Sequence, residues 1–211
     1  MKYAGMPFGM WLLFRRSFQR ELCRTLGYTR KDAGQITKDA HLEYRRIISS
    51  LPEFEKGDRF KMNIVSCAMF ASFLLKMPRK PDIPSATDYY RDAMMISTMR
   101  AFCRISAKNK YTSRDLASMQ KTAAFRAADR NPYSWNMDYL PYPDGSGYEA
   151  RFSYCGVCHL LQDLNLYEYT PAMCQLDFSM SEAGGGSDFV RQYTLASGGP
   201  YCDCGYKKKK V

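Results

Sequence analysis

The sequence has no apolar run long enough to cross a lipid bilayer. The run from Met6 to Phe14 stops at Arg15 and Arg16, and a spanning helix needs about 20 apolar residues. No small-residue cleavage site follows that run, so we expect no signal peptide. We therefore predict a cytoplasmic protein with no membrane partner. In that reducing compartment its eight cysteines should be thiols or metal ligands rather than disulfides.

The sequence also lacks a nucleic-acid-binding motif, although its formal net charge is +10. Residues 1–134 carry 25 Lys and Arg against 12 Asp and Glu, whereas residues 135–211 carry 6 against 9. A nucleic-acid interface gathers its basic residues on one surface, usually with aromatic residues or a known motif. We interpret the excess as solvated helix faces and the run Lys207–Lys210 as a solvated tail. We expect no nucleic-acid partner. Binding of nucleic acid or an acidic partner by residues 1–134 is kept as a third hypothesis, after the two that are given below.

The first part of the chain has apolar residues at helical spacing. This spacing predicts five helices, over Phe8–Leu26, Thr29–Ser50, Phe60–Lys76, Thr87–Ile105 and Thr112–Arg130. Thr29 is the expected N-cap of the second helix, and Asn131-Pro132 is expected to stop the fifth. The helix that begins at Phe60 is apolar almost all round, so we expect it to be buried at the centre.

After Pro132 the apolar period changes from 3.6 to 2. Residues 135–142 and 148–154 alternate around the turn 144–147, which predicts a β-hairpin. Short helices are expected from Gly156 and Thr170, and two more strands over 188–196 and 201–208. The predicted fold class is α+β, with about five helices followed by a small antiparallel sheet with inserted helices. We expect a helical region at 1–131 and a cysteine-rich region at 132–211, packed together as one domain.

The segment from Ser153 to Lys207 concentrates the reactive side chains. It holds His159, Asp177, Asp203 and five of the eight cysteines, namely Cys155, Cys158, Cys174, Cys202 and Cys204. On one helix, Cys174 and Asp177 would share a face because they are three residues apart. Cys155 is expected at the end of one strand and Cys202 on another, so three elements could converge on one site.

These residue types leave three roles open. A cysteine can act as a nucleophilic thiolate, or it can hold a zinc ion that activates a water molecule. It can also pack as a small buried hydrophobe. The motif Cys155-Gly-Val-Cys158-His159 matches the pattern for covalent haem attachment, but no export signal accompanies it. The flanking βαβ pattern of a thioredoxin-like motif is missing too.

The order of these residues resembles the L-2-amino-thiazoline-4-carboxylic acid hydrolase family. The resemblance rests on Cys155 before a helix, the pair Cys174-x-x-Asp177, Thr194-Leu-Ala-x-Gly198 and the pair Cys202-Asp203, over about residues 148–207. Family members show a closing strand Cys-Asp-Phe-Arg-Phe, from which Cys204-Gly205-Tyr206 departs. The family opens a thiazoline ring with water on a bacterial route to cysteine, giving an N-carbamoyl-cysteine-type product.

The resemblance implies a hydrolase that acts on a C–N or C–S bond of a small cyclic amidine. It implies catalytic roles for five residues of the segment from Ser153 to Lys207, namely Cys155, Cys174, Asp177, Cys202 and Asp203. In one version Cys174 attacks the ring and Asp177 manages protons. In the other, Cys155, Cys174, Asp177 and Cys202 hold zinc, and no other cofactor is expected.

An anionic substrate needs a cation, and Arg191 and Arg151 are the candidates on the neighbouring strands. His159 is a candidate proton carrier. A weaker similarity, to 4-vinyl reductase-like domains, supports an alternative: a non-catalytic, sensor-like domain that binds a small molecule and has structural zinc or packed cysteines. A small-molecule substrate is the expected partner, and a homo-oligomer is compatible with the sequence.

Overall fold

The computed structural model describes residues 1–128 and 130–209 of the chain. These residues divide into two compact units. The first unit comprises Met1–Met94 and Gly156–Met173, and the second comprises Met95–Cys155 and the chain from Cys174 onward. Each unit thus draws on both predicted regions, 1–131 and 132–211, and their packing as one domain stays a prediction. Within the described residues, no helix has both the length and the apolar character needed to span a membrane.

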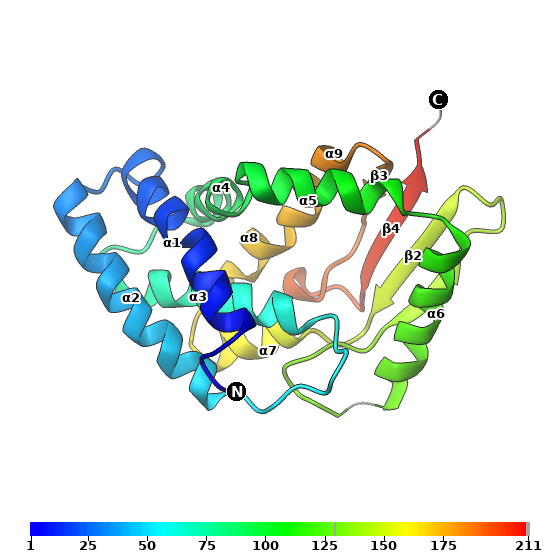
Figure 1. Ribbon diagram of the computed structural model, residues 1–211, viewed down its shortest axis with the longest axis horizontal. Coiled ribbons are helices and arrows are strands. Elements are labelled where there is room, and N and C mark those ends of the chain that lie inside the picture. The colour runs from blue at the N-terminus through cyan, green and yellow to red at the C-terminus, as the bar shows by residue number, and fades with distance from the viewer. Residues whose placement is uncertain (129, 210–211) are drawn as a thin grey trace. The chain divides into compact units, whose positions relative to one another are not determined.

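The first unit is helical. Its elements are α1 (Met6–Arg24), α2 (Arg30–Ser50), α3 (Lys61–Lys76), α4 (Ile83–Met94), α7 (Gly156–Asp163), the 3-10 helix η1 (Tyr167–Tyr169) and most of α8 (Thr170–Cys174) (Figure 1). As predicted, α3 is buried on nearly all sides, and it packs against α2 and α7. The Thr29 side chain caps α2 by accepting the Asp32 amide at 3.2 Å. The rings of Trp11 and Phe18 lie 5.8 and 5.0 Å from that of Phe73 in the core.

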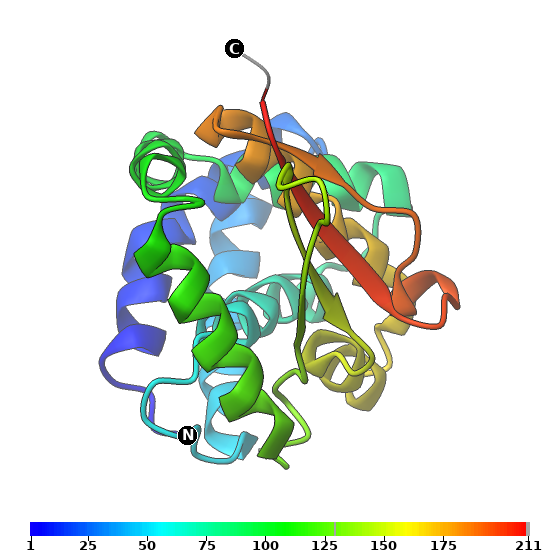
Figure 2. The ribbon, with the colours of Figure 1, turned by 90° about the vertical axis from the view of Figure 1, so that its right-hand side faces the viewer.

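The second unit combines helices with one sheet. Its elements are α5 (Ser97–Lys108), α6 (Ser113–Ala128), β1 (Asp138–Pro141), β2 (Gly147–Phe152), α9 (Leu176–Gly184), β3 (Ser187–Val190), the 3-10 helix η2 (Leu195–Ser197) and β4 (Cys202–Lys208). The strand order is β1-β2-β4-β3 and every pairing is antiparallel. Figure 2 shows β4 in red between β2 and β3. The predicted α+β class and the hairpin are confirmed.

One predicted helix is wrong, because the expected helix over Thr87–Ile105 is two helices. The helix α4 ends at Met94 and α5 begins at Ser97, with Ile96 extended at φ −66° and ψ 164°. The Arg100 Nε donates to the carbonyl of Met95 at 3.0 Å. A continuous helix would have used a main-chain amide for that carbonyl. The helix predicted to end near Arg130 is observed to Ala128, and residue 129, like the end of the lysine tail at 210–211, lies outside the described residues.

The strand predicted over residues 188–196 is also shorter than expected. It ends at Val190, because the Asp203 carboxylate accepts the main-chain amides of Gln192 and Tyr193 at 2.9 and 2.6 Å. Those amides are therefore not available to a sheet ladder. The chain then turns into η2, where the Thr194 side chain accepts the amide of Ser197.

The register of β2 and β4 assigns their side chains to two faces of the sheet. Opposite residues of an antiparallel pair share a face, and successive residues alternate. We call inner the face that carries Tyr148, Ala150, Phe152, Phe189, Cys202, Cys204 and Tyr206. We call outer the face that carries Glu149, Arg151, Asp203 and Gly205. Cys202 and Asp203 are neighbours in sequence and yet lie on opposite faces.

A close approach of α5 to α9 fixes one side of this unit (Figure 1). A Cβ atom on Gly184 would lie 3.2 Å from the carbonyl oxygen of Cys103, and one on Gly186 would lie 3.2 Å from the Ala107 Cβ. Between them Gly185 has φ +74°, in the left-handed region, and ends α9. The run Gly184–Gly186 therefore ends α9 and also allows α5 and α9 to touch.

Candidate active site

A buried arginine organises the candidate site in the second unit. Arg191 follows β3, and only 5% of its side chain is exposed. Its guanidinium lies 5.0 Å from the ring centroid of Phe178 on α9 and 5.2 Å from that of Phe189 on β3. Nη1 donates to Oδ2 of Asp177 and Nη2 to the carbonyl oxygen of Cys174, both at 2.9 Å. One side chain thus joins the two residues that the sequence paired.

Cys174 and Asp177 are close for a reason that differs from the predicted one. We expected both on one helix, but α8 ends at Cys174 and α9 begins at Leu176. In an uninterrupted helix the carbonyl of Cys174 would accept the amide of residue 178. Here Arg191 takes that carbonyl instead, so the guanidinium holds the end of one helix and the first turn of the next.

The thiols of the site are held in their protonated form. Burial raises the pKa of Cys174, and the charge of Asp177 raises it further, although Arg191 opposes both. Burial and Asp177 likewise raise the pKa of the Cys204 thiol. Burial raises the pKa of Cys202 as well, although the Leu195 amide donates to its Sγ at 3.2 Å. A Cys174 thiolate therefore needs a neighbouring group that accepts its proton.

The Asp177 carboxyl combines a raised pKa with partial exposure to solvent. Desolvation by the surrounding protein raises the pKa of its carboxyl, although Arg191 and Lys110 lower it. Yet 43% of the side chain is exposed, so the carboxyl is crowded by protein while part of it still meets solvent. The exposed fraction allows a ligand to reach it. The direction of the pKa shift brings the carboxyl closer to neutral pH, which suits an acid–base group.

Cys155 and Cys202 lie within electrostatic reach of this pair. A charge on either one raises the pKa of Cys174, and a charge on Cys155 also raises the pKa of Cys202. All eight cysteines carry thiols. Cys155, Cys174, Asp177, Arg191 and Cys202 therefore all lie in one unit, where Arg191 directly contacts Asp177 and Cys174 and the other two thiols act on Cys174 through their charge.

The remaining predicted residues lie elsewhere. Arg151 and Asp203 face each other on the outer face of the sheet. Arg151 donates from Nε to Oε1 of Glu149 at 2.6 Å, and Asp203 holds the chain after β3, as described above. His159 lies on α7 in the first unit, with its Nε2 3.8 Å from Oδ2 of Asp163. Catalytic or substrate-binding roles for these three residues stay predictions.

One residue that the sequence did not single out, Lys110, lies near this cluster and contacts Tyr206. Lys110 lies between α5 and α6, and its Nζ is 3.2 Å from the ring centroid of Tyr206 on the inner face. Desolvation lowers the pKa of Lys110 to about 8, against the charges of Asp115 and Asp177, which raise it. A displaced lysine pKa is a mark of functional sites. No pattern in the sequence distinguishes Lys110 from the other basic residues of the helical part.

The proposed zinc ligands do not fit a metal ion in the observed arrangement. Across residues 1–128 and 130–209, no three or more His, Cys, Asp or Glu side chains are grouped in a way that could hold one. One carboxylate oxygen of Asp177 is also engaged by Arg191. We therefore derive no chemical step through zinc.

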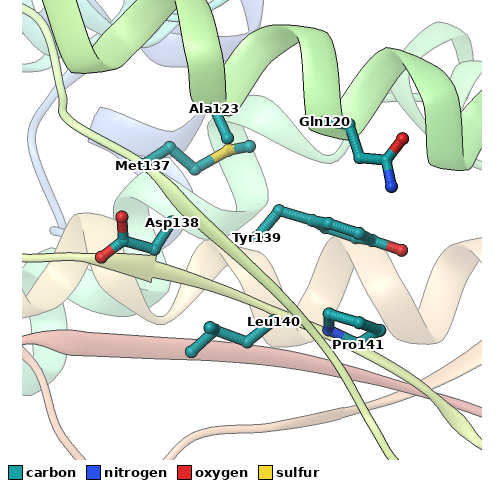
Figure 3. A pocket seen from close by; sticks show the side chains of 7 residues that line it. All are labelled: Gln120, Ala123, Met137, Asp138, Tyr139, Leu140 and Pro141. Carbon is teal, nitrogen blue, oxygen red and sulfur yellow. The ribbon is translucent and has the colours of Figure 1, made fainter.

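A shallow groove between α6 and β1 is a separate feature of the second unit (Figure 3). It is lined by Gln120, Ala123, Met137, Asp138, Tyr139, Leu140 and Pro141. Figure 3 shows Gln120 and Ala123 coming from the helix and the other five side chains from β1 and its approach. The groove contains no thiol and none of the clustered residues, so we do not assign the chemistry to it.

The second unit thus defines an α+β protein whose site combines a thiol, a carboxylate and a buried guanidinium. The family model for L-2-amino-thiazoline-4-carboxylic acid hydrolase matches residues 62–206, and the chain belongs to this family. The match begins at residue 62, so it includes helices in which the sequence showed no diagnostic motif. No curated protein and no solved structure shows significant similarity to the chain.

The structure leaves no room for a side chain at Gly205, where the sequence departs from the closing strand that the resemblance implies. A Cβ atom at this position would lie 2.3 Å from the hydroxyl oxygen of Tyr142 and 2.7 Å from Cγ2 of Val190. Residue 205 belongs to the outer face, so a side chain here would point away from Cys202 and Cys204. A side chain at residue 205 would therefore not reach the inner face, and the Tyr142 hydroxyl fills the space beside Gly205.

Proposed function

We propose that this protein is a hydrolase that opens the ring of L-2-amino-thiazoline-4-carboxylate at C2 and releases N-carbamoyl-cysteine. Family membership supports the reaction class. The observation that carries the residue assignment is that one guanidinium, that of Arg191, binds both Asp177 and the main chain of Cys174. We also propose a cytoplasmic location, where the thiols of the site would stay reduced.

The proposed reaction has two halves, with Cys174 as the nucleophile. Asp177 accepts the thiol proton while the Cys174 sulfur bonds to C2 of the ring. The bond from C2 to the ring sulfur then breaks, and the ring sulfur leaves with the proton that Asp177 held. This step produces an isothiourea linked to Cys174, which a water molecule must release.

The second half restores the enzyme and consumes one water molecule. Asp177 takes a proton from water while the oxygen bonds to C2. The bond between C2 and the Cys174 sulfur breaks, the sulfur regains that proton, and the urea group of the product remains. Arg191 holds the Asp177 carboxylate in place throughout. The high pKa of the Cys174 thiol is the reason why the reaction needs an adjacent proton acceptor.

A second candidate function is a small-molecule-binding domain without turnover. The raised pKa values of Cys174, Cys202 and Cys204 favour it, because protonated buried thiols are poor nucleophiles. In that case a bound thiazoline would leave the protein unchanged.

The test is turnover of L-2-amino-thiazoline-4-carboxylate by reduced protein, with substrate in large excess and the ring-opened product followed by mass. We expect wild type to turn over repeatedly and Cys174→Ser to be inactive with an unchanged circular dichroism spectrum. Cys23→Ser, on α1 of the first unit, is the matched control and should remain active. Full activity of Cys174→Ser would remove Cys174 from the mechanism. Absence of turnover in wild type would favour the binding domain.

A further inference from the structure

The substrate of the proposed reaction carries a carboxylate, and both arginines named from the sequence already bind other groups of the protein. The Arg191 guanidinium already donates from Nη1 to Asp177 and from Nη2 to the Cys174 carbonyl, and its side chain is almost fully buried. Arg151 lies on the outer face and donates to Glu149. The anion therefore needs another cation near Cys174 and Asp177.

Lys110 is such a cation. Its ammonium stands over the ring of Tyr206, 3.2 Å from the centroid, and within the described chain it forms no ion pair. Asp177 is close enough for its charge to act on the ammonium and on the Tyr206 hydroxyl. All three residues belong to the second unit. A part-buried ammonium that forms no ion pair with a described residue, within reach of the Asp177 charge, fits an anionic group of a ligand.

The turn that carries Lys110 is held in an unfavourable conformation. Tyr111 has φ +64° although it is not glycine, which costs free energy unless the surroundings impose it. Its amide donates to Oδ2 of Asp115 at 2.9 Å, and its hydroxyl donates to Oγ of Ser187 at 2.8 Å. The contact of α5 with α9 fixes the other end of the turn. These restraints give the ammonium a defined place before any ligand binds.

We propose that Lys110 binds the substrate carboxylate, with the Tyr206 ring beneath its ammonium, and that this contact orients C2 of the ring toward Cys174 and Asp177. The proposal rests on the proposed function for the identity of the ring. It adds the residue that selects a carboxylated substrate.

The charge state of Lys110 supports this role. The groups that face it are Asp115 from α6, Asp177 from α9 and the ring of Tyr206 from β4. Since its pKa is about 8, the side chain is mostly cationic at neutral pH and incompletely stabilised by the protein. A bound carboxylate supplies the missing negative charge and raises that pKa.

The test compares two substrates in three proteins. The substrates are L-2-amino-thiazoline-4-carboxylate and 2-amino-2-thiazoline, which lacks the carboxylate, and the proteins are wild type, Lys110→Met and Lys110→Arg. We expect Lys110→Met to raise KM for the acid about 10- to 100-fold, the range of a hydrogen bond to a charged group. Its KM for 2-amino-2-thiazoline should stay within about twofold of wild type, and Lys110→Arg should recover most of the affinity for the acid. An unchanged KM for the acid in Lys110→Met, or equal losses for both substrates, would overturn the proposal.

A binding measurement separates this proposal from the proposed reaction. Thiazolidine-4-carboxylate and thiazolidine have no amidine carbon to hydrolyse, and calorimetry gives their dissociation constants for wild type and Lys110→Met. If wild type prefers the acid through Lys110 but turns over nothing, the reaction is wrong and the carboxylate site stands. If wild type turns over the thiazoline with a KM independent of Lys110, the reaction stands and the carboxylate site is refuted.

Discussion

Removal of the Arg191 guanidinium should destabilise the second unit by an amount that its contacts set. The bond to Asp177 is charge-assisted and would contribute about 1.5–3 kcal/mol if fully buried. Because 43% of the Asp177 side chain is exposed, water can replace part of the interaction with Arg191. We therefore use the lower end of this range, about 1.5 kcal/mol. The bond to the Cys174 carbonyl adds about 1 kcal/mol. The contacts with the Phe178 and Phe189 rings add about 0.5–1 kcal/mol together.

These terms predict that Arg191→Met loses about 3 kcal/mol of unfolding free energy, since methionine preserves only the apolar part of the contacts. Arg191→Lys should lose about half as much, because it retains the charge without the planar fork. Arg191→Met combined with Asp177→Asn gives a double-mutant cycle. Its coupling energy should be about 1.5 kcal/mol, the contribution of the ion pair alone.

The assay is urea unfolding followed by tryptophan fluorescence in a Trp11→Phe background. The sequence has two tryptophans, and Trp135 is buried in the second unit, so the remaining signal reports on that unit. A loss below about 1 kcal/mol for Arg191→Met, or a coupling energy within about 0.3 kcal/mol of zero, would refute the organising role of Arg191.

Three further predictions concern the same unit. Alkylation of Cys174 by iodoacetamide, followed by peptide mass mapping, should be slower at neutral pH than alkylation of glutathione. Because burial raises the pKa of the Cys174 thiol, the reaction should accelerate only in alkaline solution. Fast labelling at neutral pH would contradict this. Gly205→Ala should cost about 1–3 kcal/mol through its clash with the Tyr142 hydroxyl, and Tyr142→Phe should recover part of the lost thermal stability. Since burial raises the pKa of Asp177, the folded state holds its proton more tightly than the unfolded state does, and the resulting stability is lost as pH rises through the folded pKa. Wild type should therefore gain unfolding free energy over Asp177→Asn on acidification from neutral pH, and a constant difference would contradict the shift.

Sequence patterns predicted the fold class and the hairpin, because helical and strand periods persist over many residues. They also named Cys174, Asp177 and Arg191, which the structure joins by hydrogen bonds. They failed where a side chain replaced a main-chain partner, as Arg100 does at the break between α4 and α5 and Arg191 does after α8. They also placed Cys202 and Asp203 together, whereas strand alternation separates them. Lys110 was missed because its environment comes from α9 and β4, far away in sequence.

The two faces of β4 restrict the kinds of mutation that the gene can accept in this segment. The even-numbered residues Cys202, Cys204 and Tyr206 lie on the inner face, and the odd-numbered residues Asp203 and Gly205 lie on the outer face. Single substitutions can therefore alter one face while the other is preserved, as Gly205 illustrates. Loss or gain of one codon would exchange the two faces at once and direct Asp203 and Gly205 inward. We expect lineages of this protein to vary in this strand by replacement and to conserve its length.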